Sequence, residues 1–194
     1  MAVESAPVPL VLCSASPRRR AFLAQLGFDF VPFAPAVDER RRPGEGPAAL
    51  AERLAREKAQ AGAREGSVAL GADTVVAIGD DDLAKPRDRD DAARMLRLLS
   101  GRTHRVITGV CVAGATVRSL AVTSVVRFRP LSEQIVRWLA ASGDGDDKAG
   151  AYAVQGLAGA FIDRIEGSFT NVVGLPLAET LELLGGAGVR MPWE

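Results

Sequence analysis

Two runs rich in β-branched residues, 104–113 and 116–128, dominate the middle of the chain and are split at Gly114. Two such runs on either side of a glycine predict a long antiparallel hairpin. Apolar runs also alternate with helical patterns from residue 8 to residue 78. Because a purely parallel sheet cannot contain a hairpin, we expect an α/β fold with a mixed β-sheet flanked by helices.

The other elements follow from the spacing of apolar residues, from caps and from breakers. For example, apolar residues recur at helical spacing from Ala92 to Leu99, and Gly101 ends that pattern. Outside the hairpin we expect strands at 8–13, 28–33 and 67–78, helices at 17–26, 48–65, 88–101, 132–141 and 176–184, a turn at 79–82, a loop at 143–147, and short strands and turns over 149–173.

At 194 residues with 47% apolar content, the chain is long enough to bury a substantial core. We expect residues 1–194 to form a single domain, or two closely joined lobes. No apolar run reaches the roughly 18 residues of a membrane span, and residues 1–9 lack the pattern of a secretory signal. Cys13 and Cys111 lie in apolar runs without metal-ligand spacing, which indicates two buried, reduced thiols in a cytoplasmic protein.

The charged residues balance, with 24 Lys and Arg against 24 Asp and Glu. This balance disfavours a nucleic-acid binder that relies on net positive charge. Lysine is rare, and the chain contains only Lys58, Lys85 and Lys148. Because lysine is a compact point charge that arginine replaces poorly in a tight polar site, these three residues are candidates for such a site. A count this small could also arise by chance.

Residues 10–20 combine the features of a phosphate-binding site. The apolar run ends in a short turn, and Pro17 then opens a helix with Ser16 as its N-cap. The helix start offers free backbone N–H groups, two hydroxyls and the guanidiniums of Arg18–Arg20, all suited to an oligophosphate. The alternative is a solvated basic cluster. Arginines at a helix N-terminus oppose the macrodipole, however, so something anionic should offset them.

Asp73 interrupts the apolar run 67–78. A carboxylate there is costly unless it meets a cation, a metal or a reacting water. Gly71, two residues earlier, allows close backbone approach, so we favour a functional role over a solvent-facing or purely structural one. Lys58 presents the same conflict, because it shares the apolar face of the helix at 48–65. Its ammonium either enters a buried site or extends past small alanines to solvent.

Three further residues carry weaker signals. Lys85 lies in a loop that Pro86 stiffens, and the loop residue Glu39 could be a second carboxylate for a divalent cation. His104 is the only histidine, and a structural imidazole at a strand edge is favoured over a general base. One histidine cannot build a Ser-His-Asp triad or a His-rich metal site. The chain also lacks a Walker-type or dinucleotide-binding glycine motif.

Five blocks of the sequence stand out together, and they span nearly the whole chain: Ser14-Ala15-Ser16-Pro17-Arg18-Arg19, Gly71-Ala72-Asp73-Thr74-Val75-Val76, Lys85-Pro86 through Leu99-Ser100-Gly101-Arg102-Thr103-His104, Lys148-Ala149-Gly150-Ala151-Tyr152-Ala153-Val154-Gln155-Gly156, and Asn171-Val172-Val173-Gly174-Leu175-Pro176-Leu177. In residues and in order they resemble the Maf nucleotide pyrophosphatases, once described as septum-formation inhibitors. Ala84, where many relatives have glycine, is a small departure.

The resemblance implies an elongated mixed sheet with a central cleft, related to the fold of inosine triphosphate pyrophosphatases. It also implies hydrolysis of a nucleoside triphosphate between the α- and β-phosphates, assisted by a divalent metal cation, Mg²⁺ or Mn²⁺. Asp73 matches the family's proton acceptor. Arg18, Thr74 and Gln155 match three positions that sort substrates. This trio resembles the subgroup that acts on dTTP and UTP, and differs from the sister subgroup that acts on 7-methylguanosine triphosphate.

Physical chemistry suggests a role for each candidate. Glu39 and Asp73 would position the metal and the attacking water, and the sequence leaves open whether Asp73 takes the proton or chiefly ligates the metal. Lys58 and Lys85 would neutralise the departing pyrophosphate. Gln155 would read the edge of a pyrimidine base by paired hydrogen bonds. The expected substrate-binding residues are Ser14, Ser16, Arg18, Arg19, Thr74 and Gln155.

Two other functions stay open at this point. A non-enzymatic cell-division regulator could bind nucleic acid or protein through Arg18–Arg20 and Arg40–Arg42, although the balanced charge and Asp73 argue against it. An enzyme for modified pyrimidine triphosphates could use the same pocket. We expect a nucleoside triphosphate as the ligand, with no nucleic acid and no membrane. Only the family resemblance suggests a homodimer.

Overall fold

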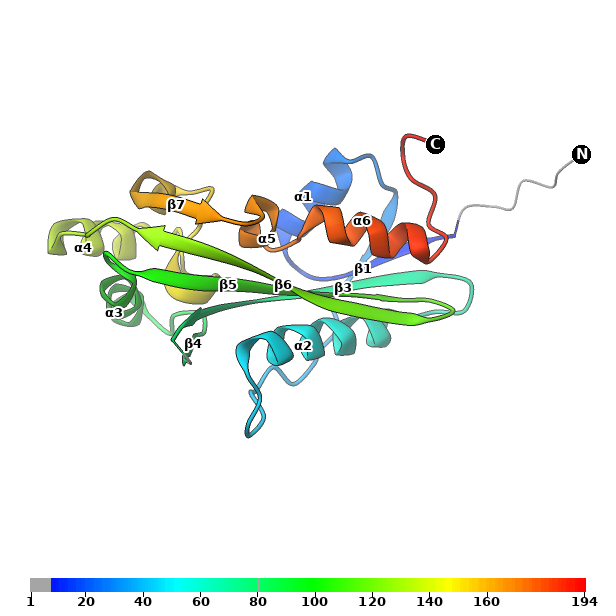
Figure 1. The fold of residues 1–194 in the computed structure, drawn as a ribbon, viewed down its shortest axis with the longest axis horizontal. Coiled ribbons are helices and arrows are strands. Elements are labelled where there is room, and N and C mark those ends of the chain that lie inside the picture. The colour runs from blue at the N-terminus through cyan, green and yellow to red at the C-terminus, as the bar shows by residue number, and fades with distance from the viewer. Residues whose placement is uncertain (1–7, 80) are drawn as a thin grey trace, which may run out of the picture.

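The computed structural model describes residues 8–79 and 81–194 (Figure 1). Its strands are β1 (Leu10–Cys13), β2 (Phe30–Phe33), β3 (Val68–Ile78), β4 (Asp81–Leu83), β5 (Thr103–Ala113), β6 (Val117–Phe128) and β7 (Ile162–Glu166). Its helices are α1 (Pro17–Gln25), α2 (Pro47–Gly62), α3 (Arg89–Leu99), α4 (Glu133–Ser142), α5 (Phe169–Val173) and α6 (Leu177–Gly186). Two short 3₁₀ helices, η1 (Ala149–Ala151) and η2 (Leu157–Phe161), precede β7.

The strands form one mixed sheet in the order β2-β1-β3-β5-β6-β7, with β4 paired to β3. Strand β1 runs parallel to β2 and β3, whereas the pairs from β3 to β7 are antiparallel. The predicted hairpin is the β5–β6 pair, in which Thr103 lies opposite Arg127 and Ala113 lies opposite Val117. The prediction of an α/β fold with a mixed sheet is therefore confirmed.

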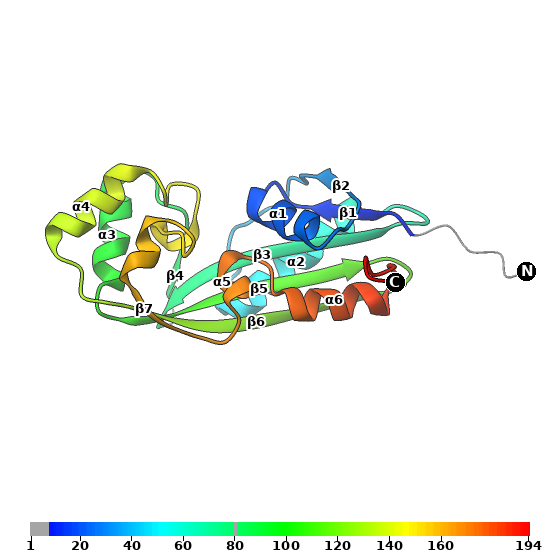
Figure 2. The same ribbon diagram turned by 90° about the horizontal axis from the view of Figure 1, so that it is seen from above.

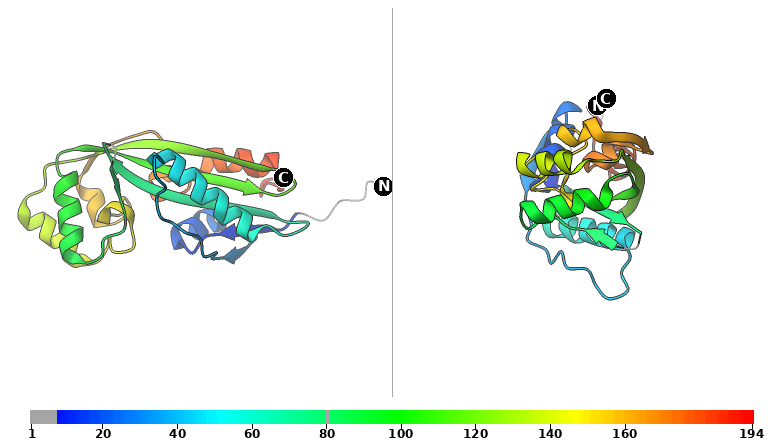
Figure 3. Two further views of the ribbon diagram at one scale, coloured as in Figure 1. Left: turned by 90° about the horizontal axis from the view of Figure 1, so that it is seen from below. Right: turned by 90° about the vertical axis from the view of Figure 1, so that its left-hand side faces the viewer.

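Helices cover both faces of the long central strands. Helix α2 lies across β3 and β5 on one face, and α6 lies along the opposite face (Figures 1 and 3). Two glycines permit the close approach of α2. A Cβ atom added to Gly71 would lie 2.2 Å from the carbonyl oxygen of Ala55, and one added to Gly109 would lie 2.1 Å from that of Ala51. Only glycine fits at these positions, so the close backbone approach predicted at Gly71 is confirmed.

The two largest hydrophobic clusters lie toward opposite ends of the sheet (Figure 2). One packs α1 and α6 against β1 and includes Leu12, Leu23 and Leu184. The other packs α3 and α4 against β5 and β6 and includes Leu96 and Phe128. The long strands β3, β5 and β6 connect the two clusters, which gives the molecule an elongated shape.

The segment 149–173 differs from its prediction as short strands and turns, because it also forms helices η1, η2 and α5. Helix α5 begins after Ser168, whose hydroxyl accepts the backbone N–H of Asn171. A helix of five residues is too short to show an apolar repeat, so periodicity could not reveal it. Of the turn predicted over 79–82, residue 80 lies outside the described residues.

Both cysteines are free and buried, as predicted. Burial raises the pKa of the Cys13 and Cys111 thiols to about 11. None of the helices in the described part of the chain has the length and hydropathy that a membrane span requires.

Candidate active site

A cleft of about 640 Å³ opens between the start of α1 on one side and the segment around η1 on the other. All the residues that the sequence analysis singled out for the site line this cleft: Ser14, Ser16, Arg18, Arg19, Glu39, Lys58, Asp73, Thr74, Lys85 and Gln155. They come from loops, from α1 and α2, and from β3. The fold thus brings together residues that are far apart in the chain.

The start of α1 forms one wall of the cleft. Ser16 is the N-cap residue and Pro17 follows it, as predicted, but the Ser16 side chain makes no capping hydrogen bond to any described residue. The hydroxyl of Ser14 accepts the backbone N–H of Ser16, at 3.2 Å. The Ser16 hydroxyl and the first N–H groups of α1 are therefore available to an anion.

Arg19, in the first turn of α1, is buried and links the start of this helix to other parts of the protein. It donates hydrogen bonds to the carbonyl oxygen of Gly174 at 2.7 Å, to Ser14 Oγ at 3.0 Å and to Thr74 Oγ1 at 3.0 Å. Burial lowers the pKa of Arg19, and the nearby charge of Asp73 opposes this effect. A guanidinium has five N–H donors, so Arg19 keeps two for a ligand after fixing the positions of two other cleft residues.

Arg18 and Arg20 lie in different environments from Arg19. Arg18 lies in the cleft, donates to the carbonyl oxygen of Val173 at 3.3 Å, and lies 3.7 Å from the Asp147 carboxylate. Arg20 is exposed and does not line the cleft. The carbonyls that accept from Arg18 and Arg19 lie at the C-terminal end of α5, where the helix dipole is negative. These carbonyls offset part of the positive charge of Arg18 and Arg19, which the sequence alone suggested would be offset by a ligand.

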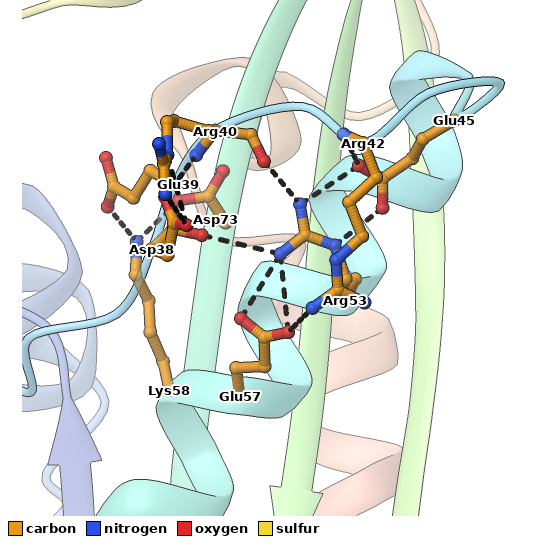
Figure 4. A network of polar contacts seen from close by, with 9 residues as sticks. All are labelled: Asp38, Glu39, Arg40, Arg42, Glu45, Arg53, Glu57, Lys58 and Asp73. Carbon is orange, nitrogen blue, oxygen red and sulfur yellow. Dashed lines mark hydrogen bonds and ion pairs between the residues drawn. The ribbon is translucent and has the colours of Figure 1, made fainter.

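Asp73 and Lys58 form an ion pair beside β3 (Figure 4). Lys58 Nζ lies 2.6 Å from Asp73 Oδ1 and 2.7 Å from Glu39 Oε1. The side chains of Lys58 and Asp73 are only 12% and 15% exposed, whereas that of Glu39 is 57% exposed. The Lys58 ammonium therefore enters a buried site and does not extend to solvent. Asp73 meets a cation, as its cost of burial requires.

The carboxyl of Glu39 is held in its charged form by this environment. Partial burial raises its pKa, but the hydrogen bond and charge of Lys58, together with the charges of Lys85 and Arg19, outweigh that effect. The pKa of Glu39 consequently lies below its ordinary value. The site therefore presents two carboxylates that share one ammonium.

Thr74 is fixed by a relay of hydrogen bonds that the sequence analysis did not detect. Its hydroxyl lies 2.9 Å from that of Thr108, which donates to the carbonyl oxygen of Asn171 at 3.0 Å. Since the Thr108 proton is used in that bond, Thr74 donates to Thr108 and accepts from Arg19. No local pattern distinguishes Thr108 or Asn171, because their partners lie on other elements.

The facing side of the cleft contributes Lys85, Gln155 and Lys148. Lys85 and Gln155 are exposed, and neither side chain has a hydrogen-bond partner among the described residues. The predicted site omits Lys148, although the rarity of lysine pointed to it. Its ammonium donates to the carbonyl oxygen of Asp144 at 2.6 Å and to the Asp147 carboxylate.

Glu39 and Asp73 are the carboxylates that would hold the expected metal, and both line the cleft. Over residues 8–79 and 81–194, no group of three or more Asp, Glu, His or Cys side chains could hold an ion. Mg²⁺ commonly binds one or two carboxylates together with waters and substrate phosphates. A pair of carboxylates in one cleft with the free start of a helix fits that kind of site.

His104 is not among the residues that line the cleft. It is 2% exposed, and its Nε2 lies 2.7 Å from the hydroxyl of Tyr152, which does line the cleft. Burial lowers the pKa of His104 to about 4, so the imidazole is neutral near pH 7. The structural role favoured for this histidine agrees with its position.

Comparison with known proteins places the chain in a family. The family model described as "Maf-like protein" matches residues 9–187. A "dTTP/UTP pyrophosphatase" of Myxococcus xanthus is 52% identical over 186 residues, which cover 95% of each chain. A Vibrio cholerae protein of the same description is 51% identical over 180 residues, covering 90% of this chain and 96% of its own.

Solved structures give a weaker likeness. A nucleoside-triphosphatase from Mycobacterium abscessus, described as a dITP/XTP pyrophosphatase, is 14% identical and covers 63% of this chain and 75% of its own, with a TM-score of 0.41. This value is too low to support a conclusion. The family match and the relatives at about half identity are decisive, and they show that the chain belongs to the Maf-like proteins.

Proposed function

We propose that this protein is a nucleoside triphosphate pyrophosphatase that hydrolyses dTTP and UTP to the nucleoside monophosphate and pyrophosphate. The observation that carries the proposal is the shared cleft, which is lined by Asp73, Lys58 and Glu39 together with the start of α1. The Maf relatives described as dTTP/UTP pyrophosphatases support the same conclusion. Modified pyrimidine triphosphates are further candidate substrates, since the same pocket could admit them.

The triphosphate lies at the start of α1. Ser14, Ser16 and Arg18 hold its oxygens, with the remaining N–H groups of Arg19 behind them. Lys58 and Lys85 neutralise the charge that develops on the departing pyrophosphate. In the reaction, a water oxygen forms a bond to the α-phosphorus while the bond from that phosphorus to the bridging oxygen breaks. That bridging oxygen leaves with the β- and γ-phosphates.

Asp73 is the group that receives the proton of the attacking water. Its Oδ1 accepts from Lys58, and its Oδ2 has no hydrogen-bond partner among the described residues. The ammonium orients the carboxylate through Oδ1 and leaves Oδ2 to act as the base. Glu39 and Asp73 would hold a divalent cation, Mg²⁺ or Mn²⁺, which would supply positive charge for the phosphates when bound.

Gln155, Thr74 and Arg18 select the substrate. The Gln155 amide has two donors and an acceptor, so it can form paired hydrogen bonds with the edge of a pyrimidine. A base without the matching groups would not form these paired hydrogen bonds and would be disfavoured. The hydrogen-bond relay behind Thr74 keeps its side chain in one position.

A non-enzymatic regulator that docks nucleic acid or protein through its arginines is not favoured. Arg40, Arg41 and Arg42 form ion pairs within the protein, with Asp38, Asp82 and Glu57 respectively. Our proposal includes a cytoplasmic enzyme that clears nucleotide pools, without a nucleic-acid partner. A homodimer and a link to septum formation belong to the proposal only through the family resemblance.

The test is hydrolysis of the common and modified triphosphates by the purified protein with Mg²⁺ or Mn²⁺ in ¹⁸O-labelled water. We expect pyrophosphate as the product, with the label in the monophosphate, because water attacks the α-phosphorus. Orthophosphate release, or label in the pyrophosphate, would contradict the proposal. Omitting the divalent cation tests the expected metal dependence in the same assay.

A further inference from the structure

Glu39 reaches the cleft from a loop, residues 34–46, that has no helix or strand of its own (Figure 4). A carboxylate on an exposed loop has many accessible positions, and a site must hold its groups to within about 0.5 Å. Lys58 fixes the Glu39 side chain, but one ion pair does not fix the backbone that carries it. The question is what holds the loop in place.

Arg53 binds the backbone on both sides of Glu39. It projects from α2, and its side chain is 12% exposed. Its Nη2 donates to the carbonyl oxygen of Arg40 at 3.0 Å, and its Nη1 lies 3.5 Å from the carbonyl oxygen of Asp38. These are the residues directly before and after Glu39. The guanidinium therefore holds the backbone at the point where the carboxylate leaves it.

Arg53 is itself held by two carboxylates. Glu45, at the far end of the loop, accepts from Nε at 2.6 Å and from Nη2 at 2.9 Å, and Glu57 accepts from Nη1 at 3.2 Å. These contacts raise the pKa of Arg53, and the hydrogen bond from Arg53 lowers that of Glu45 to about 2. Figure 4 shows the backbone beside Glu39 and the side chain of Glu45 converging on this one side chain.

All five N–H donors of Arg53 are thus engaged inside the protein. Arg53 does not line the cleft, and it has no donor left for a phosphate. Five residues further along α2, Lys58 binds the Glu39 carboxylate. Helix α2 therefore holds Glu39 at two points. Arg53 binds the backbone on either side of it, and Lys58 binds its carboxylate.

We propose that Arg53 is a positioning residue, which fixes the loop so that the Glu39 carboxylate stays beside Lys58 and Asp73 during hydrolysis. This inference rests on the proposed function, because it assigns Arg53 a part in that reaction. Lysine cannot replace it, since one ammonium cannot span two carbonyls and two carboxylates.

The first test measures the loop directly and needs no activity. The loop carries the trypsin sites Arg40 and Arg41. In Arg53→Met, we expect native-state cleavage after these residues to be at least about 10-fold faster, because the backbone around Glu39 is released. The control is Arg56→Met, on the same helix, which removes contacts with Glu52 and Ser119 instead. Equal cleavage rates in wild type and Arg53→Met, mapped by mass spectrometry, would overturn the proposal.

The second test asks whether the loop serves the reaction. We expect Arg53→Met to lower kcat for dTTP by about 10- to 100-fold with little change in KM, since displacing a group by about 1 Å has effects of this size. Because Arg53 acts through Glu39, the double variant Arg53→Met/Glu39→Gln should be no slower than Glu39→Gln alone. Multiplied losses in the double variant would show a merely structural role and overturn the proposal.

A milder variant covers the case in which Arg53→Met does not fold. Glu45→Gln keeps the size of the side chain but loses the charge that anchors Arg53. We therefore expect faster loop cleavage and a several-fold loss of kcat. The loss of kcat should be absent in the Glu39→Gln background. Full activity and wild-type cleavage of Glu45→Gln would count against the inference. Failure of the wild-type enzyme to form pyrophosphate would refute the proposed function, whereas an active wild type with a fully active Arg53→Met refutes only the inference.

Discussion

The close backbone contact between α2 and Gly71 of β3 allows a direct test of how the fold positions the site. In Gly71→Ala, the new methyl group would meet Ala55 O at 2.2 Å and the backbone nitrogen of Ala59 at 2.6 Å. Since both are backbone atoms, no side chain can yield, and the helix and strand must separate by about 1 Å. Lys58 directly precedes Ala59, so the same displacement stretches its 2.6 Å contact with Asp73.

We expect two measurable effects. Overpacking should lower the free energy of unfolding by about 1–3 kcal/mol, measured by urea denaturation. Misplacement of the ion pair by about 1 Å should lower kcat by about 10- to 100-fold, measured by pyrophosphate release from dTTP. The control is Gly185→Ala in α6, where the nearest atom lies at an ordinary 3.9 Å. It should leave both quantities unchanged or raise stability by up to about 1 kcal/mol.

Two results would refute this reasoning. An unchanged free energy of unfolding in Gly71→Ala would mean that α2 does not lie as close to β3 as the structure places it. A destabilised variant with normal kcat would mean that the distance between Lys58 and Asp73 does not limit the reaction.

Three further predictions concern single side chains. Asp73→Asn should abolish turnover while triphosphate binding, measured by calorimetry, survives; near-normal hydrolysis would remove its assigned role. Gln155→Leu should lower kcat/KM for UTP by about 10- to 100-fold and leave that for purine triphosphates unchanged, and equal losses for both would argue against base reading. Because burial lowers the pKa of His104 from 6.5 to about 4, the unfolded chain binds a proton in that window that the folded protein does not. The free energy of unfolding should therefore fall as pH drops from 6.5 toward 4, by up to about 1.4 kcal/mol per pH unit. Urea denaturation at pH 7.5 and 5.5 should show a smaller fall for His104→Gln than for the wild type. Equal falls in the two proteins would contradict the lowered pKa of His104.

The sequence was informative wherever a residue conflicted with its surroundings. Asp73 and Lys58 carry charges at positions where the pattern calls for apolar side chains, and the structure pairs them with each other. Gly71 signalled a close backbone contact, and Gly114 lies at the turn of the predicted hairpin. In each case the local pattern contained a cost that only a tertiary partner could remove.

Other contributions could not be seen in this way. Arg53 is one of many arginines and lies on a helix among other polar residues, where an arginine is ordinarily solvated. Which of Arg18, Arg19 and Arg20 is buried depends on α5, far along the chain, so the sequence could only group them. Thr108 and Asn171 contribute through neighbours that the fold brings to them. A residue that is ordinary for its local surroundings gives no local signal of the tertiary partner that defines its role.

The dependence of Arg18 and Arg19 on the carbonyls of Val173 and Gly174 has a consequence for biosynthesis. Each bond joins residues 155 positions apart. During translation, Arg18 and Arg19 emerge from the ribosome long before the carbonyls that accept their hydrogen bonds. A chain whose synthesis has not yet reached Val173 therefore contains the start of α1 without the acceptors that hold Arg18 and Arg19. The arrangement of these two guanidiniums is thus tied to a segment that is synthesised much later.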